Sequence, residues 1–388
     1  MAAQLRELAQ NPPQDANERR ELHEAARLLY MSLETPFDAM HRLFWSIYQL
    51  PATQIGVDMG LFRTLAEDAR VEWTLADLST RLKVDRTLLY RVLRYLASFG
   101  LVSESTDGTY HANSTTQWLS TPGAEGGTKH YLKTISPVAH ALPETLRQQG
   151  YQNPTNHLDT AFQKAHNTEV SAYSWTPSDP TVIPAFLEFM KSQRASQRSW
   201  TEKFPLETLR LSQSDLEANR VVFVDVGGAS GYQCVSLRQS HPELSGRIVV
   251  QDQEPVIARA NEAELKKHQI ESMAHNFFQP QPIKLAKAYY LRNIMHDWPD
   301  AKCVEILRQL RDAMAEDSVI LIDENVLPDV GASWKQAQKD MQMISVLAAV
   351  ERSVSEWHHL LKSAGLKVKK IHTYDEDIGD SVIEAALA

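Results

Sequence analysis

The stretch Val221-Val222-Phe223-Val224-Asp225-Val226-Gly227-Gly228-Ala229-Ser230-Gly231 decides the fold of this chain. Its first six residues form a nearly continuous apolar run, which is typical of a buried parallel strand. The run ends at glycines, which let the backbone turn tightly and approach a ligand without an intervening Cβ atom. We therefore expect a strand, a tight turn and a helix that begins near Gly231. The glycine spacing differs from the G-x-G-x-x-G dinucleotide fingerprint, so the glycines alone indicate function only weakly.

Similar apolar runs follow this stretch and alternate with helical patterns. The expected strands are 247–250, 288–291, 319–322 and a last one at 381–387, for which an antiparallel direction is open, and the expected helices lie near 301–315 and 353–364. Strands that alternate with helices imply right-handed crossovers and a doubly wound α/β sheet of the Rossmann type.

The composition excludes several classes of protein. The chain has 388 residues, 43% of them hydrophobic and 23% charged, which are ordinary globular values. At ~150 residues per domain, two or three packed units are expected. The net charge of −9 works against binding to nucleic acid. The two cysteines, Cys234 and Cys303, permit no disulfide scaffold, and no signal peptide or membrane-length apolar run appears, so we expect a cytoplasmic protein without membrane contact.

The patterns divide the chain into three segments. Residues 1–120 are predicted to form a mostly helical domain that includes a winged helix, because helical patterns from Gln54 onward end in a hairpin with the turn Asp107-Gly108. The apolar-faced helices of residues 1–50 need a packing partner, either a second copy of the chain or their own domain. Residues 121–205 are predicted to be a helical linker and pocket region, and residues 206–388 the Rossmann-like domain.

The middle segment is rich in aromatic and histidine side chains without strong periodicity. Such a mixture suits the wall of a pocket for a flat organic substrate, although an ordinary aromatic core is the alternative for any single residue. The candidate substrate contacts are His130, Phe162, Trp175, Met190 and Arg194.

Asp252, His296 and Glu324 each follow a predicted strand, and the carboxyl ends of strands are where doubly wound folds place their chemistry. Asp252 follows the second strand and would accept the hydroxyls of a ribose, which predicts an adenosine-containing cofactor; a helix N-cap is the alternative. His296 follows the strand at 288–291 and suits a general base. Glu324, after the next strand, and Glu351 would hold its tautomer and raise its pKa. The alternatives are a cap or a surface pair for the two glutamates and a structural role for the histidine.

Five motifs taken together resemble a known family. They are VDVGGASG (224–231), YYLR (289–292), HDWPD (296–300), LIDENVLP (321–328) and ERS (351–353). The combination, over nearly the whole chain, resembles the class I S-adenosylmethionine-dependent O-methyltransferases of the plant caffeate and flavonoid type, especially their fungal secondary-metabolism branch.

The resemblance implies roles for individual residues. The cofactor would be held by Asp225, Gly227, Gly228, Gly231, Asp252, Asn276, Phe277 and Arg292. His296 would be the general base beside Glu324 and Glu351, and Asp297 and Met343 would contact an aromatic or polyketide-type substrate. No metal is required, because the methyl group already sits on a sulfonium. A homodimer is expected.

Three other functions remain open. Some fungal relatives bind the same cofactor and promote dehydration or pericyclic cyclisation, and they tend to replace the histidine with a longer cation; here His296 is retained, which favours methyl transfer. A transcriptional regulator would use the winged helix, which the acidity of the chain disfavours. A nicotinamide dehydrogenase would use the glycine turn and Asp252 but leaves the later motifs unexplained.

Overall fold

A computed structural model describes residues 2–68, 71–196 and 198–388. The chain forms two compact units, one made of residues 1–134 with 180–195 and the other of residues 135–179 with 196–388. The two units are described separately below. The division into segments 1–120, 121–205 and 206–388 stays a prediction.

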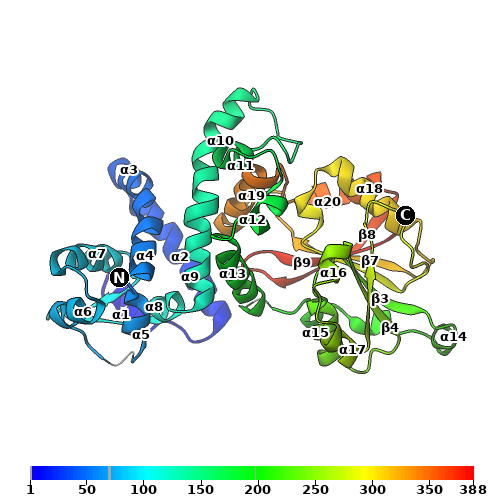
Figure 1. Ribbon diagram of the computed structural model, residues 1–388, viewed down its shortest axis with the longest axis horizontal. Helices are drawn as coiled ribbons and strands as arrows, with labels where there is room; N and C mark the ends of the chain where they lie inside the picture. Colours follow the sequence, from blue (N-terminus) through cyan, green and yellow to red (C-terminus); the bar gives the residue numbers. More distant parts are fainter. Residues whose placement is uncertain (1, 69–70, 197) are drawn as a thin grey trace. The chain divides into compact units, whose positions relative to one another are not determined.

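A seven-stranded sheet forms the centre of the second unit (Figure 1). The strands are β3 (Val221–Val226), β4 (Arg247–Asp252), β5 (Ile270–Ala274), β6 (Ala288–Arg292), β7 (Val319–Asn325), β8 (Leu366–Asp375) and β9 (Asp380–Leu387). Their order is β5-β4-β3-β6-β7-β9-β8. The first five are parallel, and β9 is antiparallel to both β7 and β8. This is the predicted doubly wound sheet with an antiparallel last strand.

Helices cover both faces of this sheet. Its helices are α14 (Gln213–Glu217), α15 (Tyr232–Ser240), α16 (Glu254–Ile257), α17 (Glu262–Lys267), α18 (Asp300–Arg311) and α20 (Val354–Ser363), with 3₁₀ turns η3 (Trp200–Glu202), η4 (Leu206–Leu209) and η5 (Met295–Asp297). Alternate residues of β3 point to opposite faces, since Val224 packs with α18 and α20 whereas Phe223 packs with α15 and Trp200. All six residues of β3 are buried, as expected for a central parallel strand.

A second helical layer belongs to the same unit. It contains α10 (Ser136–Gln148), α11 (Ala161–His166), α12 (Ala172–Ser178) and α19 (Trp334–Leu347), which lie side by side in Figure 1 and share one hydrophobic cluster. Helix α19 follows β7 through a loop, so residues near the carboxyl end of β7 and residues of α19 are brought into the same region of the unit.

The first unit contains the predicted winged helix. Helices α4 (Gln49–Asp58), α5 (Leu61–Ala66), α6 (Leu75–Leu82) and α7 (Arg86–Ser98) precede the hairpin of β1 (Ser103–Glu104) and β2 (Tyr110–His111). Gly108 has a φ of 83° in the hairpin turn, a conformation that favours glycine. Three more helices follow the hairpin: α8 (Ser114–Leu119), α9 (Pro122–His130), which leads into the π-helical turn η2 (Tyr131–Ile135), and α13 (Ile183–Ser196).

The three N-terminal helices have no core of their own. Helices α1 (Ala2–Gln10), α2 (Ala16–Leu33) and α3 (Pro36–Trp45) are described throughout, and none of their residues is buried. The 3₁₀ turn η1 (Ser46–Tyr48) continues this surface. Among the described residues, no helix combines the length and the apolar character needed to cross a bilayer.

Two strands of the sheet were not predicted from the sequence. Strand β5 is the edge strand, and three of its five residues are exposed, so it lacks the apolar run of a central strand. Strand β8, at the other edge, carries Lys367, Lys369 and Lys370 among its apolar residues. Charged edge strands limit pairing with other chains, and they also hide the strand from a search for apolar runs.

Candidate active site

The chemically active side chains of the second unit gather where the parallel strands end. Carboxyl ends of neighbouring parallel strands meet at one edge of the sheet, which is where doubly wound folds bind ligands. The glycine turn follows β3, Asp252 ends β4, the His296 turn follows β6 and Glu324 is the sixth residue of β7.

The glycine turn after β3 packs closely against side chains of the neighbouring strands and loops. A Cβ atom on Gly228 would lie 2.5 Å from the Asp225 carboxylate and 2.7 Å from Val250, so only glycine fits there. Gly231, with a φ of 77°, is the N-cap residue of α15, as the sequence predicted. A Cβ atom on Gly227 would lie 2.6 Å from Ile294, which brings the turn next to the loop that follows β6. Burial raises the pKa of Asp225 to about 7.

Asp252 supports the glycine turn through its carboxylate. Its Oδ2 atom accepts a hydrogen bond from the backbone N–H of Ala229 at 2.9 Å, and Oδ1 accepts one from the N–H of Gln253 at 2.7 Å. Ala229 has a φ of 50°, which is unusual for a residue other than glycine. The acidic residue therefore holds the turn in shape and sits beside it.

Of the other predicted cofactor residues, Phe277 borders the same turn, whereas Asn276 contacts its own loop and Arg292 contacts β7. The ring of Phe277 lies 3.8 Å from the Cβ position of Gly227, and the side chain of Asn276 accepts a hydrogen bond from the N–H of Phe278 at 3.1 Å. The Arg292 guanidinium lies 3.4 Å from the Asp323 carboxylate, so its charge is directed into the sheet edge.

Glu324 shapes the turn that carries His296. Its side chain is almost completely buried, and Oε1 accepts hydrogen bonds from the backbone N–H groups of Ile294, Met295 and His296 at 2.9, 2.8 and 3.3 Å. One carboxylate oxygen on β7 thus binds the first turn of η5. The second oxygen, Oε2, lies 3.5 Å from Nδ1 of the His296 ring.

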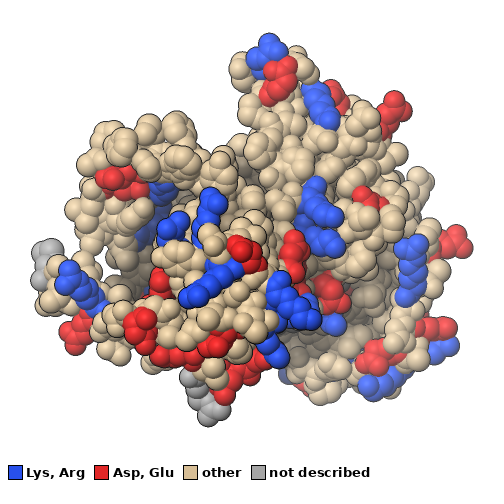
Figure 2. All heavy atoms as spheres, turned by 60° about the vertical axis from the view of Figure 1, so that its left-hand side comes forward, with Lys and Arg blue, Asp and Glu red and all other residues tan. Residues whose placement is uncertain are grey.

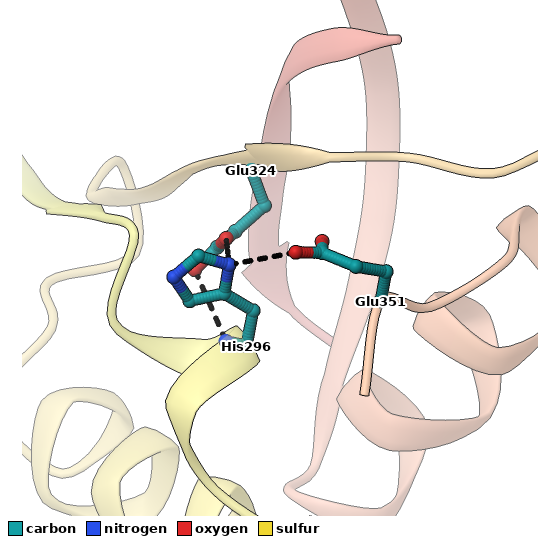
Figure 3. Close-up of side chains that lie close together, drawn as sticks. All are labelled: His296, Glu324 and Glu351. Carbon is teal, nitrogen blue, oxygen red and sulfur yellow. Dashed lines mark hydrogen bonds and ion pairs between the residues drawn. The ribbon is translucent and has the colours of Figure 1, made fainter. Parts of the chain in front are cut away.

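Two buried carboxylates approach one nitrogen of the His296 imidazole (Figure 3). Its Nδ1 atom is 3.0 Å from Oε1 of Glu351, which comes from the segment between α19 and α20, and Glu324 approaches the same nitrogen from β7. The structure therefore brings together the three residues that the sequence placed in one cluster. Because Nδ1 faces only carboxylate oxygens here, we assign its proton to that side of the ring.

Three further residues belong to this cluster: Asp297, which the sequence predicted as a substrate contact, and Tyr173 and Lys339, which received no role from the sequence. Asp297 Oδ1 lies 3.3 Å from His296 Nε2, and the Tyr173 hydroxyl of α12 interacts with the Asp297 carboxylate. The Lys339 ammonium of α19 lies 3.0 Å from Oε1 of Glu351. Lys339 precedes Met343 by four residues on one helix, so a predicted pocket role for Met343 already pointed to the same helix face.

The charges of this cluster set the protonation of His296. Burial opposes a charged imidazole, but the carboxylates of Glu324, Asp297 and Glu351 outweigh it and raise the pKa of His296 to about 9. Burial raises the pKa of Glu324. For Glu351 burial acts in the same direction, but the positive charges of His296 and Lys339 outweigh it and lower the pKa. At neutral pH the ring is therefore mainly protonated in the free protein.

Ligand atoms of His296, Glu324 and Glu351 lie within 4.8 Å of one another, a spacing that a cation could bridge. The Lys339 ammonium already contacts Glu351, and the imidazolium already contacts both carboxylates. Positive charge at this place is thus supplied by the protein's own side chains.

The predicted substrate contacts fall into two groups. Phe162 is fully buried against Met343 in one hydrophobic cluster of the second unit, with Trp175 packed edge-on at 5.5 Å, which favours a packing role for Phe162. His130 belongs to the first unit, where its ring packs against Phe186 and burial lowers its pKa to about 4. Met190 and Arg194 lie on α13 of that unit, and the side chain of Arg194 is outside the described part. One pocket lined by both groups stays a prediction.

Arg352 holds the His296 turn from the other side. Its fully buried guanidinium donates to the backbone carbonyls of Met295 at 3.0 Å and Trp298 at 2.8 Å, and it contacts Asp300 at 2.7 Å. The residue after Glu351 therefore fixes both ends of the turn that carries the imidazole.

Replacing Arg352 with Met should lower the free energy of unfolding by about 3 kcal/mol, because two buried carbonyls lose their donor. Urea unfolding measures this. Arg308→Met is the matched control, since Arg308 lies on α18 and donates to an exposed carbonyl. Equal stability of the two variants would contradict a structural role for the Arg352 contacts.

Comparisons with known proteins agree with this geometry. A family model described as an O-methyltransferase domain matches residues 142–367, and one described as an O-methyltransferase dimerisation domain matches residues 51–122. The O-methyltransferase LepI of Aspergillus flavus is 37% identical over 95% of this chain and 94% of its own length. Demethylsterigmatocystin 6-O-methyltransferase of Aspergillus parasiticus is 36% identical over 92% of this chain and 90% of its own.

Solved structures show the same likeness. A structure titled as a pericyclic reaction enzyme has a TM-score of 0.88 and 36% identity, with 100% of this chain and 98% of that chain covered. A structure of LepI in complex with S-adenosylmethionine has a TM-score of 0.88 and 35% identity over the same shares. Because the family models and the relatives both cover most of the sequence, this chain belongs to the O-methyltransferase family.

Proposed function

We propose that this protein transfers a methyl group from S-adenosylmethionine to a hydroxyl of a small aromatic or polyketide-type secondary metabolite, with His296 as the general base. The observation that carries the proposal is the buried imidazole whose Nδ1 atom lies 3.0 Å from Glu351 at the ligand-binding edge of the sheet. The family membership and the relatives' names support the reaction type.

The glycine turn fits such a cofactor. A Cβ atom on Gly227 would clash with Ile294, and one on Gly228 with Asp225, so side chains at these positions would displace the turn at the ligand-binding edge of the sheet. Asp225, Gly231, Asp252, Asn276 and Arg292 lie at the same edge and would complete the binding site. When bound, S-adenosylmethionine supplies an electrophilic methyl group on a sulfonium.

The residues of the cluster then determine how the acceptor hydroxyl loses its proton. A phenol has a pKa of ~10 and is mostly protonated at neutral pH, so removal of its proton as it attacks improves the nucleophile. Glu351 and Glu324 occupy the Nδ1 side of His296, which leaves Nε2 to take the proton from the hydroxyl oxygen. The Nε2 proton that faces Asp297 in the free protein must leave first. Asp297 and Met343 would contact the acceptor.

Replacing His296 with Ala should reduce turnover by about 100-fold or more, the usual contribution of a general base, and leave the affinity for S-adenosylmethionine nearly unchanged. Release of S-adenosylhomocysteine from a panel of phenolic acceptors measures turnover, and thermal stabilisation by the cofactor measures affinity. His358→Ala is the control, because His358 lies on the exposed side of α20. Full turnover by His296→Ala would remove the general-base role.

A second function is favoured by one specific observation. The carboxylates raise the pKa of His296 to about 9, so at neutral pH the ring is an imidazolium that can donate a hydrogen bond or a proton. Such a group suits dehydration or pericyclic cyclisation of a bound metabolite, in which the charge of the sulfonium assists without transfer of its methyl group. The match to a structure titled as a pericyclic reaction enzyme supports this alternative.

The direction of the pH dependence separates the two functions. If neutral His296 is the base, kcat/KM should rise roughly tenfold per pH unit and become constant above a pH of about 9, the pKa of the ring. If the imidazolium is the acid, the rate should fall above that pH. Mass spectrometry of the product adds a second readout, because methylation adds the mass of one CH₂ group and releases S-adenosylhomocysteine, whereas cyclisation alone does neither.

The partner and the location that we propose are supported by the charge of the protein. Lys and Arg side chains lie among Asp and Glu side chains on the face drawn in Figure 2, in line with a small-molecule substrate as the partner. A cytoplasmic location, without nucleic acid or a membrane as partner, is part of the proposal and is supported by the composition of the chain.

We further propose a homodimer that covers the N-terminal helices. Leu43, Phe44 and Trp45 of α3 expose 64%, 59% and 52% of their surfaces, although side chains of this size contribute most when buried. The matched dimerisation domain, residues 51–122, begins directly after this segment.

Replacing Phe44 with Glu should weaken dimerisation by about 10-fold or more without unfolding the chain, because the ring is exposed within one copy. Light scattering over a dilution series measures this. Val330→Glu is the control, since Val330 is exposed in a loop of the second unit. A wild-type protein that is monomeric at all concentrations would contradict the proposed dimer.

A further inference from the structure

The Lys339 ammonium and the His296 ring share one carboxylate oxygen. Lys339 Nζ and His296 Nδ1 each lie 3.0 Å from Oε1 of Glu351. The other oxygen, Oε2, is buried and accepts no hydrogen bond from the described residues. Two positively charged groups therefore compete for a single acceptor atom, and they lie no more than about 6 Å apart, a range at which unit charges interact strongly inside a protein.

We propose that Lys339 is a positioning residue of the proposed reaction, whose ammonium contacts the Glu351 oxygen that also faces His296 and thereby restrains the basicity of the ring. Only the expected effect on turnover rests on the proposed function. The electrostatic relation between Lys339 and His296 holds with or without a bound substrate.

The surrounding charges show why a second cation is needed. Six segments contribute the groups that face the ring, its carboxylate partners or Lys339. They are Asp297 (η5), Glu324 (β7), Lys339 and Asp340 (α19), Glu351 and Arg352 (the segment before α20), Tyr173 (α12) and, beside Lys339, Asp380 (β9). Carboxylates outnumber cations in this set. Without Lys339, the imidazolium would be the main cation balancing Glu351, and its proton would be held more tightly.

The position of Lys339 fits an electrostatic effect on the pKa of His296 better than a purely structural role. Its side chain keeps 34% of its surface exposed, so its stem contributes little to the core. Asp340, the next residue, accepts a hydrogen bond from the N–H of Glu351 at 2.9 Å, so α19 already anchors the Glu351 backbone without Lys339. What Lys339 adds to the cluster is its charge.

The sign of the effect follows from charge alone. Removing a positive charge stabilises the protonated ring, so the pKa of His296 should rise by about one unit in Lys339→Met. Because neutral His296 is the base, the rising limb of the pH profile should move to higher pH by the same amount. At pH 7.5, turnover should then fall about tenfold, and it should recover at high pH.

The direct test is an NMR titration of the His296 ring without substrate. Protein labelled with ¹⁵N-histidine is titrated, and the His296 signal is assigned by its loss in His296→Asn. We expect a higher midpoint in Lys339→Met and a midpoint close to wild type in Lys339→Arg, which keeps the charge. Lys335→Met is the matched control, because Lys335 lies one turn earlier on α19 and pairs with Asp377 outside the cluster.

An unchanged or lower midpoint in Lys339→Met would overturn the inference. Lys339→Gln provides a second neutral variant if the Met variant does not fold, with folding checked by circular dichroism. A purely structural role would lower turnover equally at all pH values and leave the midpoint in place. If the midpoint shifts but the wild-type protein transfers no methyl group, the electrostatic inference stands and the proposed function fails.

Discussion

The candidate site depends on one interaction, the acceptance of three backbone N–H groups by the Oε1 atom of Glu324. A buried carboxylate is costly unless hydrogen bonds and a cation compensate it, and here both are present. The same contact fixes the turn after β6 and therefore fixes the position of the imidazole. Arg352 donates hydrogen bonds to two carbonyl groups of this turn. Charged side chains therefore bind both the N–H groups and the carbonyl groups of the turn.

The arrangement has a consequence for the chemistry. Carboxylates on both sides of the ring orient it, but they also favour its charged form, and the pKa of His296 reaches about 9. An imidazole with this pKa binds a proton tightly and is mostly protonated at neutral pH. The same geometry thus suits proton removal at high pH and proton or hydrogen-bond donation at low pH, which is a physical reason why one fold can support methyl transfer and cofactor-assisted cyclisation.

Much of the fold could be predicted from local patterns. The central strands are continuous apolar runs, and the turn at Asp107-Gly108 and the glycines after β3 need backbone conformations that few other residues adopt. The edge strands β5 and β8 escaped prediction because an exposed strand has no such run. Within the site, His296, Glu324 and Glu351 were found since two of them follow strands and all three match family motifs, whereas Lys339 lies in the middle of a helix that no motif marks.

The sequence by itself determined the central strands with the helices between them, the glycine turn and the identity of the charged residues, because these follow from composition and spacing along the chain. Only the tertiary structure decided which charges meet. Residues 173, 296, 324, 339 and 351 come from five different segments, and their distances depend on how α12, α19 and the sheet pack together. A pKa is set by neighbours in space and by burial, and neither is encoded in sequence separation.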